Sequence, residues 1–303
     1  MSKRKADEKE DIQMKEDGDD SSDEDEDMKD IVNVDLDFFD PKPIDYEANK
    51  RLIMQLFGAD AELFNVSELS DLIIAQPQVG STVKVDGADS DPFALLTVLN
   101  MNAHKGKDSI AAVRKYLTSK CPKKDSKMLE AVTNILSADR DSESGDTALV
   151  LSERLINMPV QIMAPMYKML AEEVEWAVED GEPFKFSWYV IPAKTYKEVE
   201  PTADMDEEDE EERPKPVVSK KKKRTVDTPS NPLYYFHPED EVIEAHSTYY
   251  FDYALTHADK EAVSDSRRVF AEVGIAVGRR VFFVEGSKMK DMIQEIERQF
   301  STT

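Results

Sequence analysis

The amino-acid sequence predicts an α/β protein with a single mixed sheet flanked by helices. Runs that alternate apolar and polar residues, typical of strands, are interspersed with segments of helical periodicity. Hydrophobic residues make up 40% of the 303 residues, which is enough to build a buried core. Similar patterns occur on both sides of a charged stretch, residues 192–230. One domain with a long insertion is therefore expected, and two docked domains are the alternative.

The first folded part is expected to cover residues 31–191. Residues 31–39 (IVNVDLDFF) alternate as a half-buried strand does, and prolines follow them. Asp45 is suited to cap a helix that ends at Gly58. The further predicted elements are a helix over 67–76, strands over 79–85 and 93–101, helices over 109–117 and 126–136, a short apolar run over 147–151, an amphipathic helix from Pro159 to Gly181, and a strand over 184–191.

The second folded part, residues 231–303, is expected to complete the same domain. Gly278 is interpreted as a turn between two core strands, which leaves Arg279 and Arg280 exposed. The predicted elements are strands over 233–236 and 247–253 around a short helix that begins near Pro238, strands over 268–277 and 281–284, and a terminal helix capped by Ser287.

Composition limits the classes of function. The net charge is -25, and much of the excess acid falls within the predicted folded parts, so bare DNA or RNA is an improbable ligand. Cys121 is the only cysteine, which excludes an internal disulfide and a thiolate zinc site. The apolar runs are too short to cross a bilayer, and the chain starts without an apolar leader. A secreted or integral membrane protein is not expected.

Residues 1–30 are predicted to be a disordered acidic tail, because they offer almost nothing to bury. Ser21 and Ser22 precede an acidic run, a context that acid-directed kinases favour, so both are candidate phosphorylation sites. A tail that only aids solubility is the alternative.

Residues 192–230 are predicted to be a disordered linker that carries two opposite charge runs. A compact basic run in a flexible segment is typical of a nuclear import address, and an acidic run favours cationic protein partners. Together they predict a nuclear binding protein, in which the acidic run could mask the basic one. The acidic run is Asp206, Glu207, Glu208, Asp209, Glu210, Glu211 and Glu212, and the import candidate is Lys220, Lys221, Lys222, Lys223 and Arg224.

The sequence contains no G-x-x-x-x-G-K-[ST] loop, G-x-G-x-x-G turn, G-x-S-x-G elbow or H-E-x-x-H pair, so the common nucleotide-binding, hydrolase and zinc-protease motifs are absent. His237 and His246 flank a short acidic helix, for which a solvated surface is favoured over a metal or acid/base cluster. Residues 274–280 (GIAVGRR) combine glycines with a basic pair, but their spacing differs from that of a phosphate loop. Trp176 and Trp188 are expected in the core.

Three stretches carry a family resemblance: residues 32–57 (VNVDLDFFDPKPIDYEANKRLIMQLF), 89–104 (DSDPFALLTVLNMNAH) and 183–198 (PFKFSWYVIPAKTYKE). They resemble the BCCIP family, also called the protein BCP family, in its fungal form, and the likeness extends over most of residues 31–300. The resemblance implies a nuclear, non-catalytic binding protein. Fungal members are associated with chaperoning a basic large-subunit ribosomal protein and with nuclear export of a phosphoinositide kinase; animal members are linked to recombination repair and cell-cycle inhibition.

The resemblance also implies the overall shape of a GNAT acetyltransferase. That superfamily holds acetyl-CoA with [QR]-x-x-G-x-[GA], whereas Arg268 is followed by Val269-Phe270-Ala271 and no glycine stands where the motif requires one. A GNAT-like fold without its acetyl-CoA site is therefore expected, with no cofactor, no metal and no catalytic residue.

The sequence and the resemblance together predict a nuclear acidic chaperone or adaptor that shuttles to the cytoplasm. Its expected partners are a basic ribosomal protein of the large subunit, a phosphoinositide kinase cargo and nuclear transport receptors, without direct nucleic-acid contact or membrane insertion. A histone-type chaperone and a divergent GNAT-like acyltransferase that uses residues 274–280 are the alternatives. The candidate client contacts are the acidic run 206–212 and, on the long helix, Glu172, Glu173, Glu175, Glu179 and Asp180.

Overall fold

The computed structural model describes residues 10–12, 34–139, 145–198, 232–258 and 274–301. The strands of these residues form one mixed sheet in the order β1-β2-β3-β4-β5-β6-β9-β8, and β7 pairs with β6 beside this path. The strands are β1 (Glu10–Ile12), β2 (Val34–Phe39), β3 (Ser81–Lys84), β4 (Ala94–Asn100), β5 (Asp146–Arg154), β6 (Phe186–Glu198), β7 (Leu233–Tyr235), β8 (Tyr249–Tyr253) and β9 (Ile275–Glu285).

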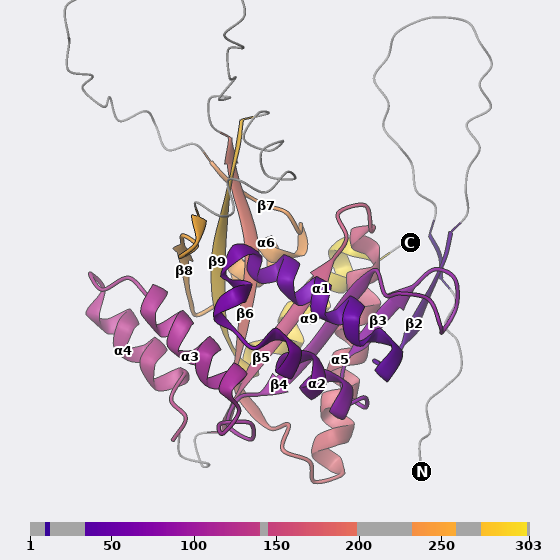
Figure 1. Ribbon diagram of the computed structural model, residues 1–303, viewed down its shortest axis with the longest axis horizontal. Helices are drawn as coiled ribbons and strands as arrows, with labels where there is room; N and C mark the ends of the chain where they lie inside the picture. Colours follow the sequence, from indigo (N-terminus) through magenta and orange to yellow (C-terminus); the bar gives the residue numbers. More distant parts are fainter. Residues whose placement is uncertain (1–9, 13–33, 140–144, 199–231, 259–273, 302–303) are drawn as a thin grey trace, which may run out of the picture.

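Helices cover both faces of the sheet, so the predicted α/β class with one flanked sheet is confirmed (Figure 1). The α-helices are α1 (Tyr46–Phe57), α2 (Val66–Ala75), α3 (Asp108–Lys120), α4 (Ser126–Ile135), α5 (Met163–Glu179), α6 (Glu239–His246) and α9 (Met289–Phe300). Short 3-10 turns precede or follow them: η1 (Pro43–Asp45), η2 (Gly58–Leu63), η4 (Val160–Ile162) and η5 (Gly286–Lys288).

Strand alternation divides the apolar side chains between two cores. In β4, Leu96 and Val98 contribute to one core, whereas Leu95 and Leu99 contribute to the other. Helices α5, α6 and α9 close the first core, which we call the α5 face. Helices α1, α2, α3 and α4 close the second core, which we call the α1 face. The protein is therefore a three-layer α/β/α structure.

Strands from both sides of residues 199–231 belong to this sheet. Strand β6 pairs with β9 along eleven register positions, from Trp188↔Glu285 to Glu198↔Ile275, and the two strands extend together beyond the helices (Figure 1). Strand β9 runs through Gly278 without a turn, so the predicted division into two strands is wrong. A Cβ at Gly278 would lie 2.9 Å from Thr195 Oγ1, which explains a glycine at this point of a paired strand.

Residues 10–12 also depart from the prediction, which placed them in a disordered tail. They form β1 and pair antiparallel with β2, from Glu10↔Leu36 to Ile12↔Val34. Without β1, the outer backbone groups of β2 would lack hydrogen-bond partners from the sheet. The rest of the predicted tail, with Ser21 and Ser22, lies outside the described residues.

The only parallel pairing in the described sheet joins β5 to β6, and it is short. It runs from Asp146↔Phe186 to Leu149↔Val190. Strand β5 continues to Arg154 and β6 to Glu198, and the described parts of the two strands share no further ladder. The sheet therefore opens between them, and polar side chains occupy this opening.

Candidate functional site

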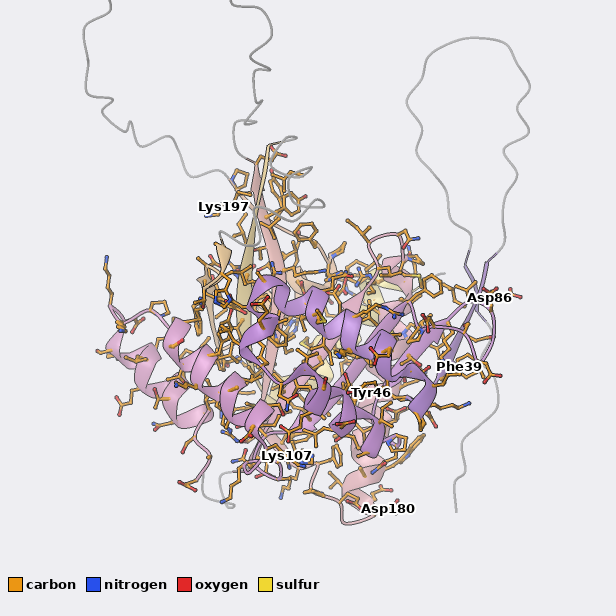
Figure 2. The ribbon with its side chains drawn as sticks, viewed as in Figure 1. Phe39, Tyr46, Asp86, Lys107, Asp180 and Lys197 are labelled. Carbon is orange, nitrogen blue, oxygen red and sulfur yellow. The ribbon has the colours of Figure 1, made fainter. Side chains whose placement is uncertain are left out.

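The last two turns of α5 carry most of the predicted client contacts on the long helix. Met166, Tyr167, Leu170 and Ala177 are buried on the α5 face of the sheet. Glu175 and Glu179 lie on the opposite side of the helix and are exposed. Asp180, the residue that follows the helix, is also exposed, and Glu172 is half-buried. Asp180 is labelled at the far end of this helix in Figure 2, away from Lys197 near the end of β6.

Two apolar side chains are exposed among these carboxylates. Trp176 is 51% exposed, although it was expected in the core, and Val178 is 40% exposed. The reason is angular: successive residues of a helix are about 100° apart, so Trp176 and Val178 lie to either side of the buried Ala177. We call this set the α5 acidic surface; it consists of Glu172, Glu175, Trp176, Val178, Glu179 and Asp180.

The end of α5 has a defined backbone conformation and a concentration of negative charge. Gly181 has φ of 81° and donates its N–H to Val178 O at 3.1 Å, and Glu182 N donates to Ala177 O at 2.8 Å. No basic residue lies in the last turn, so the carbonyl end of the helix adds to the charge of the carboxylates. Among the residues that the structure describes, none forms an ion pair with the four carboxylates of this surface.

Glu173 is a correction to the predicted contact set. Its side chain is only 7% exposed and accepts a hydrogen bond from Gly80 N at 2.7 Å. The partner is a constrained site, because Gly80 has φ of 120° and a Cβ there would lie 2.5 Å from Thr97. Glu173 therefore fixes the start of β3 against α5 and cannot meet a client.

Replacing Glu173 or Glu175 with alanine, one at a time, should distinguish a glutamate that stabilises the fold from one that only lies on the surface. Glu173→Ala leaves the buried N–H of Gly80 without its acceptor, so we expect a loss of about 1–3 kcal/mol in the free energy of unfolding. Glu175→Ala, two residues away and exposed, should change this free energy by less than about 0.5 kcal/mol. Urea unfolding of both variants provides the measurement, and equal losses would contradict the assigned roles.

The remaining predicted site residues cannot be placed on this surface. The acidic run 206–212 and the basic run 220–224 lie outside the described residues, so their roles stay predictions. Residues 274–280, considered as a divergent phosphate loop, are described, and they correct that interpretation. Arg279 is buried and donates from Nε to Leu56 O at 3.0 Å, while Arg280 is held by Asp252 at 2.6 Å. Both guanidinium groups were expected to be exposed, and both are used inside the fold.

A buried polar cluster occupies the opening between β5 and β6. Glu153 Oε1 accepts from Lys194 Nζ at 2.7 Å and from Gln55 Nε2 at 3.0 Å, and His237 Nε2 lies 3.2 Å away. Burial alone would raise the pKa of Glu153, but His237 and Lys194 lower it below the ordinary glutamate value. The prediction of a solvated helix with ordinary histidines is therefore wrong at His237, which is enclosed by the fold.

The start of α6 is buried with this cluster. Glu239 was expected in a solvated acidic helix, but it forms a two-point ion pair with Arg154 and is almost fully enclosed. No group of three or more histidine, cysteine, aspartate or glutamate side chains in the described residues is arranged to hold a metal ion. None of the helices found there is long and apolar enough to span a membrane.

Comparison with known proteins identifies the family. The BCCIP family model matches residues 31–243. Protein bcp1 of Aspergillus oryzae is 44% identical over 302 residues, which cover 98% of this chain and 98% of the relative. The chain belongs to the BCCIP family. Protein bcp1 of Schizosaccharomyces pombe is a further relative, 38% identical over 305 residues that cover 99% of this chain and 100% of that protein.

A solved structure shares the fold of this BCCIP-family chain. The crystal structure of BCP1 from Saccharomyces cerevisiae superimposes with a TM-score of 0.57 at 25% identity, covering 92% of this chain and 100% of that chain. The family membership predicted from the three sequence stretches is confirmed. The likeness to GNAT acetyltransferases stays a prediction.

Proposed function

We propose that this BCCIP-family protein is a nuclear acidic chaperone or adaptor that binds and shields a basic ribosomal protein of the large subunit. In this role it supports ribosome biogenesis and the nuclear export of client proteins. The α5 acidic surface carries the proposal, because it combines four carboxylates that have no ion-pair partner in the described chain with a half-exposed tryptophan. Nuclear location rests on the basic run 220–224.

The chemistry of this surface suits a cationic polypeptide. Carboxylates attract lysine and arginine side chains, and their fixed spacing on a helix favours one arrangement of the partner's charges. Trp176 offers an aromatic face to a guanidinium or ammonium group and apolar area for packing. Tryptophan is among the residues that most often dominate binding energy at protein interfaces. A basic protein held in this way would be kept from other polyanions until it is released.

We also propose that this protein binds its client without catalysing a reaction. Its fold would then have the shape of a GNAT acetyltransferase but no acetyl-CoA site. Two observations support it. The opening between β5 and β6 is occupied by Glu153, Lys194 and His237. Arg279 and Arg280, which a divergent cofactor loop would need to present to phosphates, are committed to partners within the fold. Acetyl-CoA at millimolar concentration should therefore leave the melting temperature unchanged.

The variant Trp176→Ala tests the surface directly. We expect it to weaken binding of a purified basic large-subunit ribosomal protein by about 10- to 30-fold, the effect of losing a central aromatic anchor. Because Trp176 is half exposed, the variant should keep the thermal stability of the parent chain. Biolayer interferometry measures the dissociation constants of the parent chain and of the variant. Nuclease treatment beforehand removes RNA that could bridge the two proteins.

A matched pair of charge reversals distinguishes this surface from net charge. Glu175→Lys with Glu179→Lys should abolish most of the binding. Glu47→Lys with Asp71→Lys makes the same change in net charge at exposed positions of α1 and α2, on the other side of the sheet, and should have a small effect. Equal losses for both pairs would contradict the assignment. Core histones bound as tightly as ribosomal proteins would favour a histone-type chaperone instead.

A further inference from the structure

The excess acid of this protein is not spread evenly, because one segment is strongly basic. Residues 105–127 hold all of α3 and the start of α4, and they contain only two acidic side chains, Asp108 and Asp125. The basic side chains of the segment are Lys105, Lys107, Arg114, Lys115, Lys120, Lys123, Lys124 and Lys127.

Half of these basic side chains are committed to the fold. Lys105 lies 3.7 Å from Asp139, Lys107 lies 4.0 Å from Glu68, and Lys120 donates to Ala254 O at 2.5 Å. Arg114 is buried and donates to Leu136 O. The other four are exposed and form no ion pair with any residue that the structure describes. Lys115 lies on α3, and the remaining three lie just before or at the start of α4; these three, Lys123, Lys124 and Lys127, we call the α4 lysine surface.

An aromatic groove lies beside this lysine surface. Ala131 and Asn134 of α4 form one wall, Trp188 of β6 and Tyr249 of β8 form the other, and Ser137 and Asp139 complete it. The rings of Trp188 and Tyr249 are stacked, with centroids 6.0 Å apart and planes inclined by 29°. Lys127 lies four residues before Ala131, so it lies on the same side of α4 and leads into the groove.

We propose that the α4 lysine surface and this groove together bind a single-stranded polynucleotide. Lysines without exposed arginines suit phosphate groups, which need charge but no base-specific geometry. An aromatic wall next to a positively charged surface is the arrangement that holds single strands, because unpaired bases stack on it. Asn134 and Ser137, which also line the groove, offer hydrogen-bonding groups for base edges.

Three other polyanions fit this surface less well. An acidic peptide would pair with the lysines, but its carboxylates would not stack in the aromatic groove. An anionic membrane would need apolar side chains that insert, and none of the large exposed apolar residues in the described chain lies on α3 or α4. The bases of a duplex are already paired and stacked, so they could not enter the groove.

The net charge of -25 does not prevent this binding. The α5 acidic surface belongs to the opposite face of the sheet from α3 and α4 (Figure 1). Charges separated by more than the screening distance of about 8 Å at physiological ionic strength interact weakly. The proposal therefore departs from the expectation of no direct nucleic-acid contact, and it does not depend on the proposed client.

Salt-dependent binding of a labelled oligouridylate to the full chain tests the lysines. Replacing Lys123, Lys124 and Lys127 by glutamine should weaken binding at least tenfold and lower the slope of log K against log salt by about 2, since each phosphate contact contributes about 0.7 for a single strand. Replacing Lys168, Lys185 and Lys290, which are exposed elsewhere, should change both quantities much less. No binding at low salt, or equal losses in the two triple variants, would overturn the proposal.

The intrinsic fluorescence of the protein tests the groove. The chain has two tryptophans, so Trp176→Phe leaves Trp188 as the only reporter. Oligouridylate should quench the emission of Trp188 to a limiting value, and added salt should restore it. The same titration with an oligodeoxynucleotide of equal length shows whether the protein distinguishes ribose from deoxyribose. Binding without a change at Trp188, or equal quenching by polyglutamate or anionic vesicles, would overturn the assignment.

Discussion

Replacing Asp45 with alanine is expected to lower the free energy of unfolding by about 3–5 kcal/mol, because the change leaves a buried charge without its partner. Asp45 Oδ1 lies 2.6 Å from Lys84 Nζ, and the two side chains are 1% and 0% exposed. The ammonium group would keep its hydrogen bond to Ala88 O at 2.7 Å and its position 5.6 Å from the centre of the Phe39 ring, but it would have no counter-charge among these contacts. Lys42 N would also lose its acceptor, Asp45 Oδ2 at 2.9 Å. Urea unfolding measures the loss.

Two comparisons isolate the cause of this loss. Asp91→Ala breaks the pair between Arg51 and Asp91, which has the same 2.6 Å separation but is 61% and 70% exposed, so it should cost less than about 1 kcal/mol. Asp45→Leu combined with Lys84→Met removes both buried charges and should recover most of the stability. A loss below 1 kcal/mol for Asp45→Ala would show that Lys84 reaches water or another partner.

Asp45 also shows what sequence could predict about the fold. Its position before an apolar helical face predicted an N-cap, and α1 does begin at the next residue. Its side chain, however, makes no cap hydrogen bond to α1; it accepts from Lys42 N at the preceding 3-10 turn and pairs with Lys84 of β3. Local pattern fixes where an element begins, whereas the partner of a buried charge depends on which strand packs nearby. The same reason explains β9, where Gly278 was interpreted as a turn that leaves Arg279 exposed, whereas Arg279 is buried inside a paired strand.

The candidate surface shows the same limit. The carboxylates near the end of α5 could be predicted, because acid on the outer side of an amphipathic helix is visible in the sequence. Glu173 was wrongly included and Trp176 was wrongly placed in the core. Counting 100° per residue from the buried positions of α5 to Trp176 would have predicted that its side chain is exposed. No local signal could have shown that Glu173 meets Gly80, since that contact joins residues far apart in the chain.

Replacing Glu153 with glutamine is expected to cost about 3–5 kcal/mol at neutral pH, because Glu153 is the buried anion that balances Lys194. The amide oxygen of glutamine can still accept from Gln55, so the exchange removes the charge and keeps this hydrogen bond. Burial already lowers the pKa of Lys194 despite the carboxylate, so removing Glu153 would favour loss of the lysine proton still further. Glu130→Gln, the same exchange at an exposed position of α4, should change the free energy of unfolding by less than about 0.5 kcal/mol.

The pH dependence of this difference carries a definite sign. The pKa of Glu153 is lower in the folded protein than its unfolded value of about 4.3, so its contribution is fully present above that value and is lost as pH falls through the folded pKa. The stability difference between the parent chain and Glu153→Gln should thus shrink as pH falls below about 5. A difference that grows below pH 5 would mean that Glu153 is protonated in the native state, and that Lys194 and His237 do not hold it as a carboxylate.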